Sequence, residues 1–147
     1  MNPKNILVPI DFSDYAKAAL DEADSLAQQS GAELTLLHIH EMTQVAIMDF
    51  TYVEPPEKVA EILTAAEKQL QQWAEQLGTP PERRSIRSTT GGAAQEIIDE
   101  SENYDLIVMP THGRTGLSHF LLGSVAERVV QGAKCSVLIV KKPGEGE

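Results

Sequence analysis

The feature that most constrains the fold is a regular alternation of short apolar runs with longer segments of helical periodicity. Continuous apolar runs of about five residues occur where both faces of a strand are buried, as in a parallel sheet. Apolar residues three and four positions apart line one side of a helix instead. Because the two patterns alternate from Ile6 to Val140, the sequence predicts an open parallel sheet with right-handed crossovers and helices on both faces.

Five strands and four helices are expected. The expected strands cover residues 6–10, 34–39, 84–89, 105–109 and 136–140, of which the third is the most polar. The expected helices run from a cap at Ser13 to Gly31, from Pro55-Pro56 to Gly78, over Ala93–Glu102 and over about Leu117–Gln131. With 147 residues, 41% of them hydrophobic, we expect one domain spanning 1–147 with a flexible tail from about residue 141.

One connection is longer than a strand-to-helix loop needs to be. It runs from Glu41 to Glu54 and is rich in apolar residues, namely Val45, Ile47, Met48, Phe50, Tyr52 and Val53. Two interpretations have equal support: a loop folded onto its own domain, or a lid or partner surface.

Charge and cysteine usage exclude several classes of function. A formal charge of −10 without any basic cluster argues against binding to nucleic acid or anionic membranes. No apolar run approaches the roughly 20 residues that cross a bilayer. The single cysteine, Cys135, cannot form an internal disulfide and no signal peptide is recognisable, so we expect a reducing, cytoplasmic location.

Ligands of open parallel sheets bind beyond the carboxyl ends of the strands, so the loops after the first and fourth strands are the ones to examine. The fourth strand opens at Met109 into a loop containing glycines and then a helix. Glycines let backbone N–H groups approach an anion closely, and a helix N-terminus favours negative charge. The segment 109–125 therefore predicts a phosphate-binding loop.

Three stretches of the chain resemble the universal stress protein family. Gly113, nine further residues and Gly123-Ser124 are similar to the signature G-x2-G-x9-G-[S/T] of the ATP-binding members. The opening Ile6–Ser13 and the ending Val125–Val140 also resemble that family, so the likeness covers nearly the whole chain. It implies an α/β domain of the adenine nucleotide alpha hydrolase-like type, with a five-stranded parallel sheet, and a homodimer paired through the last strands.

The resemblance also implies that ATP, with Mg²⁺, lies across the ends of the first, second and fourth strands. Carried over by position, the residues bordering adenine and ribose are Pro9, Ile10, Asp11 and Ile39. Those at ribose and phosphates are Gly113, Gly123, Ser124 and Val125, and Met109 and Ala126 complete the expected contacts. The chain departs from the signature at Pro110, where a proline stands in place of the first glycine and removes one amide donor.

Three further assignments stay open between two roles. Asp11 either binds a ribose hydroxyl or water-coordinated Mg²⁺, or caps the following helix, a task that Ser13 or Asp14 can also perform. His112 and Arg114 either face phosphate or are solvated loop side chains. His38 and His40 share a strand face, but no third ligand stands at recognisable metal-site spacing, and half-buried structural histidines are the alternative.

Other nucleotide folds lack support, because neither G-x4-G-K-[S/T] nor G-x-G-x2-G occurs. Asp11 and Asp14 would repel a flavin phosphate, and a phosphoacceptor domain would need an aspartate near Ser88. We therefore predict an ATP-binding, nucleotide-responsive stress-response dimer without strong catalysis, acting on a client that the sequence does not identify. The alternatives are a nucleotide-independent dimeric adaptor and a slow ATPase or autophosphorylating protein, for which no catalytic base or arginine pair is visible.

Overall fold

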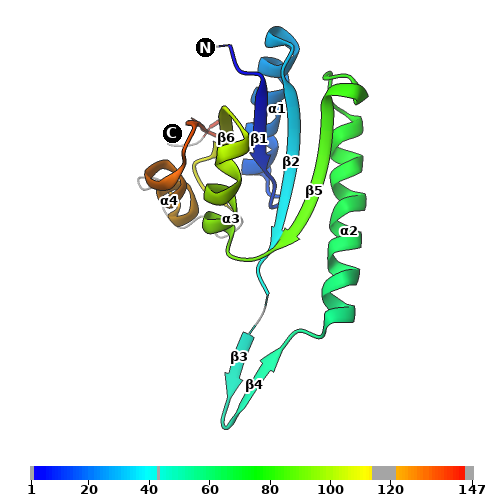
Figure 1. The fold of residues 1–147 in the computed structure, drawn as a ribbon, viewed down its shortest axis with the longest axis vertical. Coiled ribbons are helices and arrows are strands. Elements are labelled where there is room, and N and C mark those ends of the chain that lie inside the picture. Colours follow the sequence, from blue (N-terminus) through cyan, green and yellow to red (C-terminus); the bar gives the residue numbers. More distant parts are fainter. Residues whose placement is uncertain (1, 43, 114–121, 145–147) are drawn as a thin grey trace.

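A computed structural model describes residues 2–42, 44–113 and 122–144 of the chain (Figure 1). Five parallel strands form one sheet in the order β5-β2-β1-β6-β7. Their bounds are β1 Asn5–Pro9, β2 Glu33–His40, β5 Arg84–Thr90, β6 Leu106–Pro110 and β7 Ser136–Val140. The predicted five-stranded α/β fold is confirmed, including the polar third strand.

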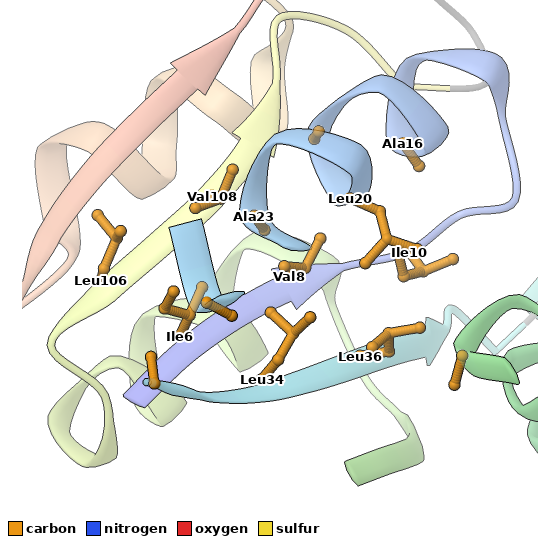
Figure 2. Packing of buried hydrophobic residues seen from close by; sticks show 14 of the residues in the cluster. Ile6, Val8, Ile10, Ala16, Leu20, Ala23, Leu34, Leu36, Leu106 and Val108 are labelled. Atoms are coloured by element: carbon orange, nitrogen blue, oxygen red, sulfur yellow. The ribbon is translucent and has the colours of Figure 1, made fainter. Parts of the chain in front are cut away.

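Helices cover both faces of the sheet. They are α1 Asp14–Ser30, α2 Pro56–Glu75, α3 Ala93–Glu100 and α4 Ser124–Gly132, with short 3₁₀ turns at Pro81–Arg83 and Ser101–Asn103. Alternate residues of the strands point into two separate cores. Ile6 and Val8 pack with α1 and α2, as Figure 2 shows for the α1 side, whereas Leu7 packs with α3 and α4.

The predicted start and end of the first helix are confirmed. The Ser13 side chain accepts a hydrogen bond of 3.1 Å from the Ala16 N–H, and Gly31 ends the helix with φ +76°. The second helix ends at Glu75, before the predicted Gly78. The N–H groups of Gly78 and Thr79 donate instead to the Asp24 carboxylate, at 2.9 Å each, which fixes the connection against α1.

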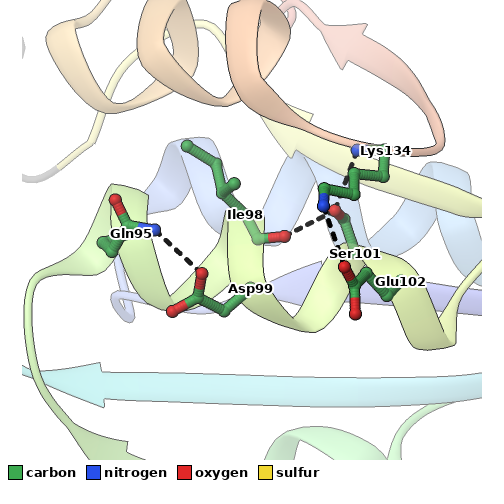
Figure 3. A network of polar contacts seen from close by, with 6 residues as sticks. All are labelled: Gln95, Ile98, Asp99, Ser101, Glu102 and Lys134. Atoms are coloured by element: carbon green, nitrogen blue, oxygen red, sulfur yellow. Dashed lines mark hydrogen bonds and ion pairs between the residues drawn. The ribbon is translucent and has the colours of Figure 1, made fainter.

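The third helix is shorter than predicted, because Ser101–Asn103 form a 3₁₀ turn. The Ser101 hydroxyl donates to the Ile98 carbonyl at 2.5 Å and accepts from the Lys134 N–H at 2.9 Å (Figure 3). The Lys134 ammonium also contacts Glu102 at 2.9 Å. This network joins the end of α3 to the segment that leads into β7.

The fourth helix begins at Ser124, so the predicted start is wrong for residues 122 and 123, and 117–121 lie outside the described residues. Gly123 has an extended backbone with ψ 153°, and its N–H donates to the Thr111 carbonyl at 2.7 Å. Because that bond turns the chain toward β6, Gly123 caps the helix instead of belonging to it.

The long connection from Glu41 to Glu54 is an antiparallel hairpin, which the sequence analysis treated as a loop. It consists of β3 Gln44–Ile47 and β4 Phe50–Val53. The hairpin projects past the carboxyl ends of β2 and β5 and does not lie over the sheet (Figure 1). The interpretation of a loop folded onto its own domain is therefore wrong.

None of the helices in the described part of the chain combines the length and the apolar character needed to cross a bilayer.

The Asp24 carboxylate provides a test of this packing. Burial opposes its ionisation, yet the hydrogen bonds from Thr79, Gly78 and Gln28 prevail and hold the pKa of Asp24 below its ordinary value. A lowered pKa stabilises the fold above the unfolded-state pKa and ceases to do so as pH falls through the folded-state value. We expect Asp24→Asn to lower the free energy of unfolding by about 1 kcal/mol at pH 7, and by less at pH 3.

Urea unfolding at the two pH values measures this difference. Asp21→Asn is the matched control, because Asp21 lies on the same helix and forms only an exposed pair with Lys17. An equal loss for both variants, or no change with pH, would contradict the assignment.

Candidate functional site

A cavity of about 800 Å³ opens at the carboxyl ends of β1, β2 and β6. Its walls include the loop after β6, the first residues of α4 and the inner sides of α2 and α3. The strand order explains the position: β1 lies between β2 and β6, and the chain adds β2 and β5 on one side of β1 before it crosses to β6 and β7 on the other side. Such a switch point leaves a crevice beyond the strands.

Eleven of the twelve residues predicted to bind the ligand line this one cavity. They are Pro9, Ile10, Asp11, Ile39, Met109, His112, Gly113, Gly123, Ser124, Val125 and Ala126. The twelfth, Arg114, lies outside the described residues. Residues more than 100 positions apart in the sequence therefore line the same cavity.

Asp11 does not cap α1, because Ser13 is the N-cap; Asp11 supports that cap and borders the cavity. Its Oδ1 accepts from the Ser13 N–H at 3.0 Å and the Ser13 hydroxyl at 2.5 Å, which orients the hydroxyl that caps α1. Phe12, between them, has a positive φ of 64° and packs its ring against His38 and Trp73. This local turn directs the carboxylate toward the loop that follows β6.

The two glycines stand where a side chain would collide with the opposite wall. A Cβ on Gly113 would lie 2.8 Å from Oδ2 of Asp11. A Cβ on Gly123 would lie 3.0 Å from the Thr111 carbonyl oxygen and 3.3 Å from the His112 Cα. A side chain at Gly123 would press on backbone atoms, and one at Gly113 would require the Asp11 carboxylate to move.

The N-terminus of α4 places the positive end of a helix dipole at the cavity. The first N–H groups of a helix have no acceptor within it, and Ser124, Val125 and Ala126 all line the cavity. Asp11 and Glu41 contribute negative charge at other points of the wall. The arrangement suits an anion at α4 and a hydroxyl or hydrated cation at Asp11.

His112 is not a solvated loop side chain, since only 8% of it is exposed. Its Nδ1 lies 3.1 Å from the Thr111 hydroxyl, and its ring lies 5.8 Å from that of Tyr15, on which the Lys142 ammonium rests. That alternative is therefore wrong for His112.

His38 and His40 are half-buried and engaged with other groups. The Nδ1 of His38 lies 2.7 Å from the Ile10 carbonyl oxygen, and the Nε2 of His40 lies 2.6 Å from a Glu54 carboxylate oxygen. The described ranges contain no group of three or more potential metal ligands. The structural interpretation of both histidines fits these contacts.

Pro110 ends β6 without interrupting the sheet. The pairing of β6 with β1 ends at Leu7–Ile107, while its pairing with β7 continues to Pro110–Val140. A residue without an N–H is tolerated at such a strand end. The proline is thus compatible with the sheet, and it lines the cavity.

The sequence did not indicate much of the cavity wall. The lining residues not expected from it include Phe12 after β1, Leu37 and His38 on β2, Ile62, Ala65, Ala66 and Gln69 on α2, and Ala93 and Ile97 on α3. Ile62 and Ala66 belong to the apolar stripe of α2, but the stripe alone does not show that the first turns of α2 lie beyond the end of the sheet (Figure 1).

Comparison with known proteins agrees with this architecture. The model of the universal stress protein family matches residues 2–141. Universal stress protein MJ0531 of Methanocaldococcus jannaschii is 36% identical over 95% of this chain and 83% of its own length. The structure of UspA from Lactobacillus plantarum is similar with a TM-score of 0.73 at 28% identity, covering 93% of this chain and 97% of that one.

A universal stress protein solved in complex with cAMP shares the fold, with a TM-score of 0.70 at 22% identity over 97% of this chain and 99% of its own. The family match, the relative and the fold together identify the chain: it belongs to the universal stress protein family.

Proposed function

We propose that the protein is an ATP-binding regulatory dimer that acts through nucleotide-dependent changes of its surface and not through strong catalysis. The observation that carries the proposal is the convergence of Asp11, Gly113 and Gly123 around one cavity, beside the N-terminus of α4. The cAMP complex of a protein with this fold supports an adenine nucleotide as the ligand class.

The cavity offers a suitable surface to each part of ATP. Ile39 and Met109 supply apolar contacts for adenine, and Asp11 accepts from a ribose hydroxyl or holds Mg²⁺ through water. The phosphates lie against Gly113 and the first N–H groups of α4, beside the Ser124 hydroxyl. Each charged hydrogen bond contributes about 1.5–3 kcal/mol, so three or four account for micromolar affinity.

Two contacts connect the cavity to the hairpin. His40 and Glu41 line the cavity, and His40 holds Glu54, which directly follows β4. A Glu41 oxygen accepts from the Ala93 N–H at 3.0 Å, at the start of α3. A nucleotide that displaces either side chain therefore changes the base of the hairpin, which makes the surface nucleotide-responsive.

Titration calorimetry with Mg²⁺-ATP on the nucleotide-stripped protein tests the binding. We expect micromolar affinity in the natural chain and a loss of at least tenfold in Gly123→Val, whose side chain would meet the Thr111 carbonyl. Gly92→Val is the matched control: Gly92 caps α3 as Gly123 caps α4, but a Cβ there meets nothing within 4 Å.

The absence of binding heat up to millimolar ATP would reject the proposal in favour of the nucleotide-independent adaptor. That second function has one observation in its favour, which is Pro110 in the cavity wall in place of an amide donor.

The dimer contact is proposed at β7. Among the described residues this strand is an edge of the sheet, paired to β6 alone, and Leu138 on it is 36% exposed. An unpaired apolar edge is suited to pairing with a second copy. We expect Leu138→Asp to convert dimer to monomer in sedimentation equilibrium at about 10 μM, because two added charges would face each other across the contact.

Ser85→Asp is the control, since it places the same charge on β5, the opposite edge of the sheet. If the Leu138→Asp variant dimerises as the natural chain does, β7 is not part of the dimer contact.

A further inference from the structure

We propose that the hairpin of β3 and β4 is a second self-association surface, at which two copies of this chain pack their apolar hairpin faces together. This contact is separate from the one proposed at β7, because the hairpin lies beyond the carboxyl ends of the strands (Figure 1). The structure thus assigns the segment a partner of defined chemistry, a second copy of the same hairpin.

The register of the hairpin gathers three of its exposed apolar side chains, Ile47, Phe50 and Tyr52, on one face, while Val53 lies on the other face with Thr51. Ile47 is paired directly with Phe50, and residues opposite each other in an antiparallel pair share a face. Tyr52 stands two positions along β4, on the same face as Phe50. Thr51, paired with Ala46, points to the other face.

This face is open to solvent in the single chain. The exposed fractions are 62% for Ile47, 78% for Phe50 and 45% for Tyr52, and Met48 at the turn is 96% exposed. A two-stranded hairpin is marginally stable in water unless further strands or a covering surface bury its apolar side. The hairpin therefore gains stability from a partner that covers this face.

The distribution of charge favours a second copy as that partner. Each chain carries a formal charge of −10, so two copies repel each other over most of their surface. Within residues 44–53 the only charged residue is Asp49, in the turn. The hairpin is thus a region where two acidic chains can approach with little repulsion and bury apolar area in return.

The self-complementarity of the hairpin face and its exposed area also favour a second copy as the partner. Two identical apolar faces related by a two-fold axis match in length and chemistry without any added polar group. Ile47, Met48, Phe50 and Tyr52 of two copies together offer on the order of 1,000 Å² of exposed side chain, the size of a weak specific interface. The association is therefore expected at concentrations of about 10–100 μM.

Analytical ultracentrifugation of the full chain in the Leu138→Asp background tests the proposal without interference from β7. We expect concentration-dependent association that Phe50→Asp weakens at least tenfold, since an aspartate on each copy would be buried against its counterpart. Thr51→Asp, which places the same charge on the other face of the same strand, is expected to change it less than threefold.

Ile47→Asp provides a second variant on the apolar face and is expected to behave as Phe50→Asp does. Thermal unfolding of each variant verifies the fold, which the exposed hairpin should leave unchanged. Equal effects of Phe50→Asp and Thr51→Asp would overturn the proposal. A chain that stays monomeric up to about 1 mM would also overturn it, and the partner of the apolar hairpin face would then be a different protein. If Leu138→Asp itself changes nothing, only the β7 contact fails and the hairpin comparison stands.

Discussion

Strand β1 holds the two halves of the sheet together, since it pairs with β2 on one side and with β6 on the other. Its alternate side chains enter both cores: Ile6 and Val8 pack toward α1, and Leu7 toward α3 and α4. All three are fully buried. The position of every other strand, and therefore of every ligand-facing loop, depends on this double burial, because the chain adds β2 and β5 on one side and β6 and β7 on the other.

The same strand determines the chemistry of the cavity. Where β1 ends, the chain must turn into α1, and the Asp11 carboxylate stabilises that turn by accepting two hydrogen bonds from Ser13. The turn leaves the other carboxylate oxygen beside Gly113, across the end of β6. Ser13 is the cap of α1, and Asp11 supports it by orienting its hydroxyl, so the predicted cap role of Asp11 itself is wrong, while its carboxylate still lies in the cavity wall.

The acidity of the chain and the apolar hairpin are connected features. Like charges on most of the surface keep copies of the chain apart, while a nearly uncharged hairpin and an apolar edge strand offer places where contact is favourable. His40 lines the cavity and contacts Glu54 at the end of the hairpin, so the hairpin and the cavity are joined through one short segment.

The local patterns of the sequence were sufficient for much of the fold. Apolar runs predicted the strands because parallel strands are buried on both faces, and Ser13 and Gly31 marked α1 because caps satisfy backbone groups locally. The glycine spacing also indicated the loop after β6, and the eleven described residues of the predicted set surround one cavity.

Only the tertiary structure decided the features that depend on distant partners. Gly123 became a cap because its N–H reaches the Thr111 carbonyl, and α2 ended before Gly78 because Asp24 of α1 accepts the next N–H groups. The burial of His112 and the walls supplied by α2 arise in the same way. Local propensity acts on neighbours in the chain, whereas these contacts join residues that become neighbours only after the sheet has formed.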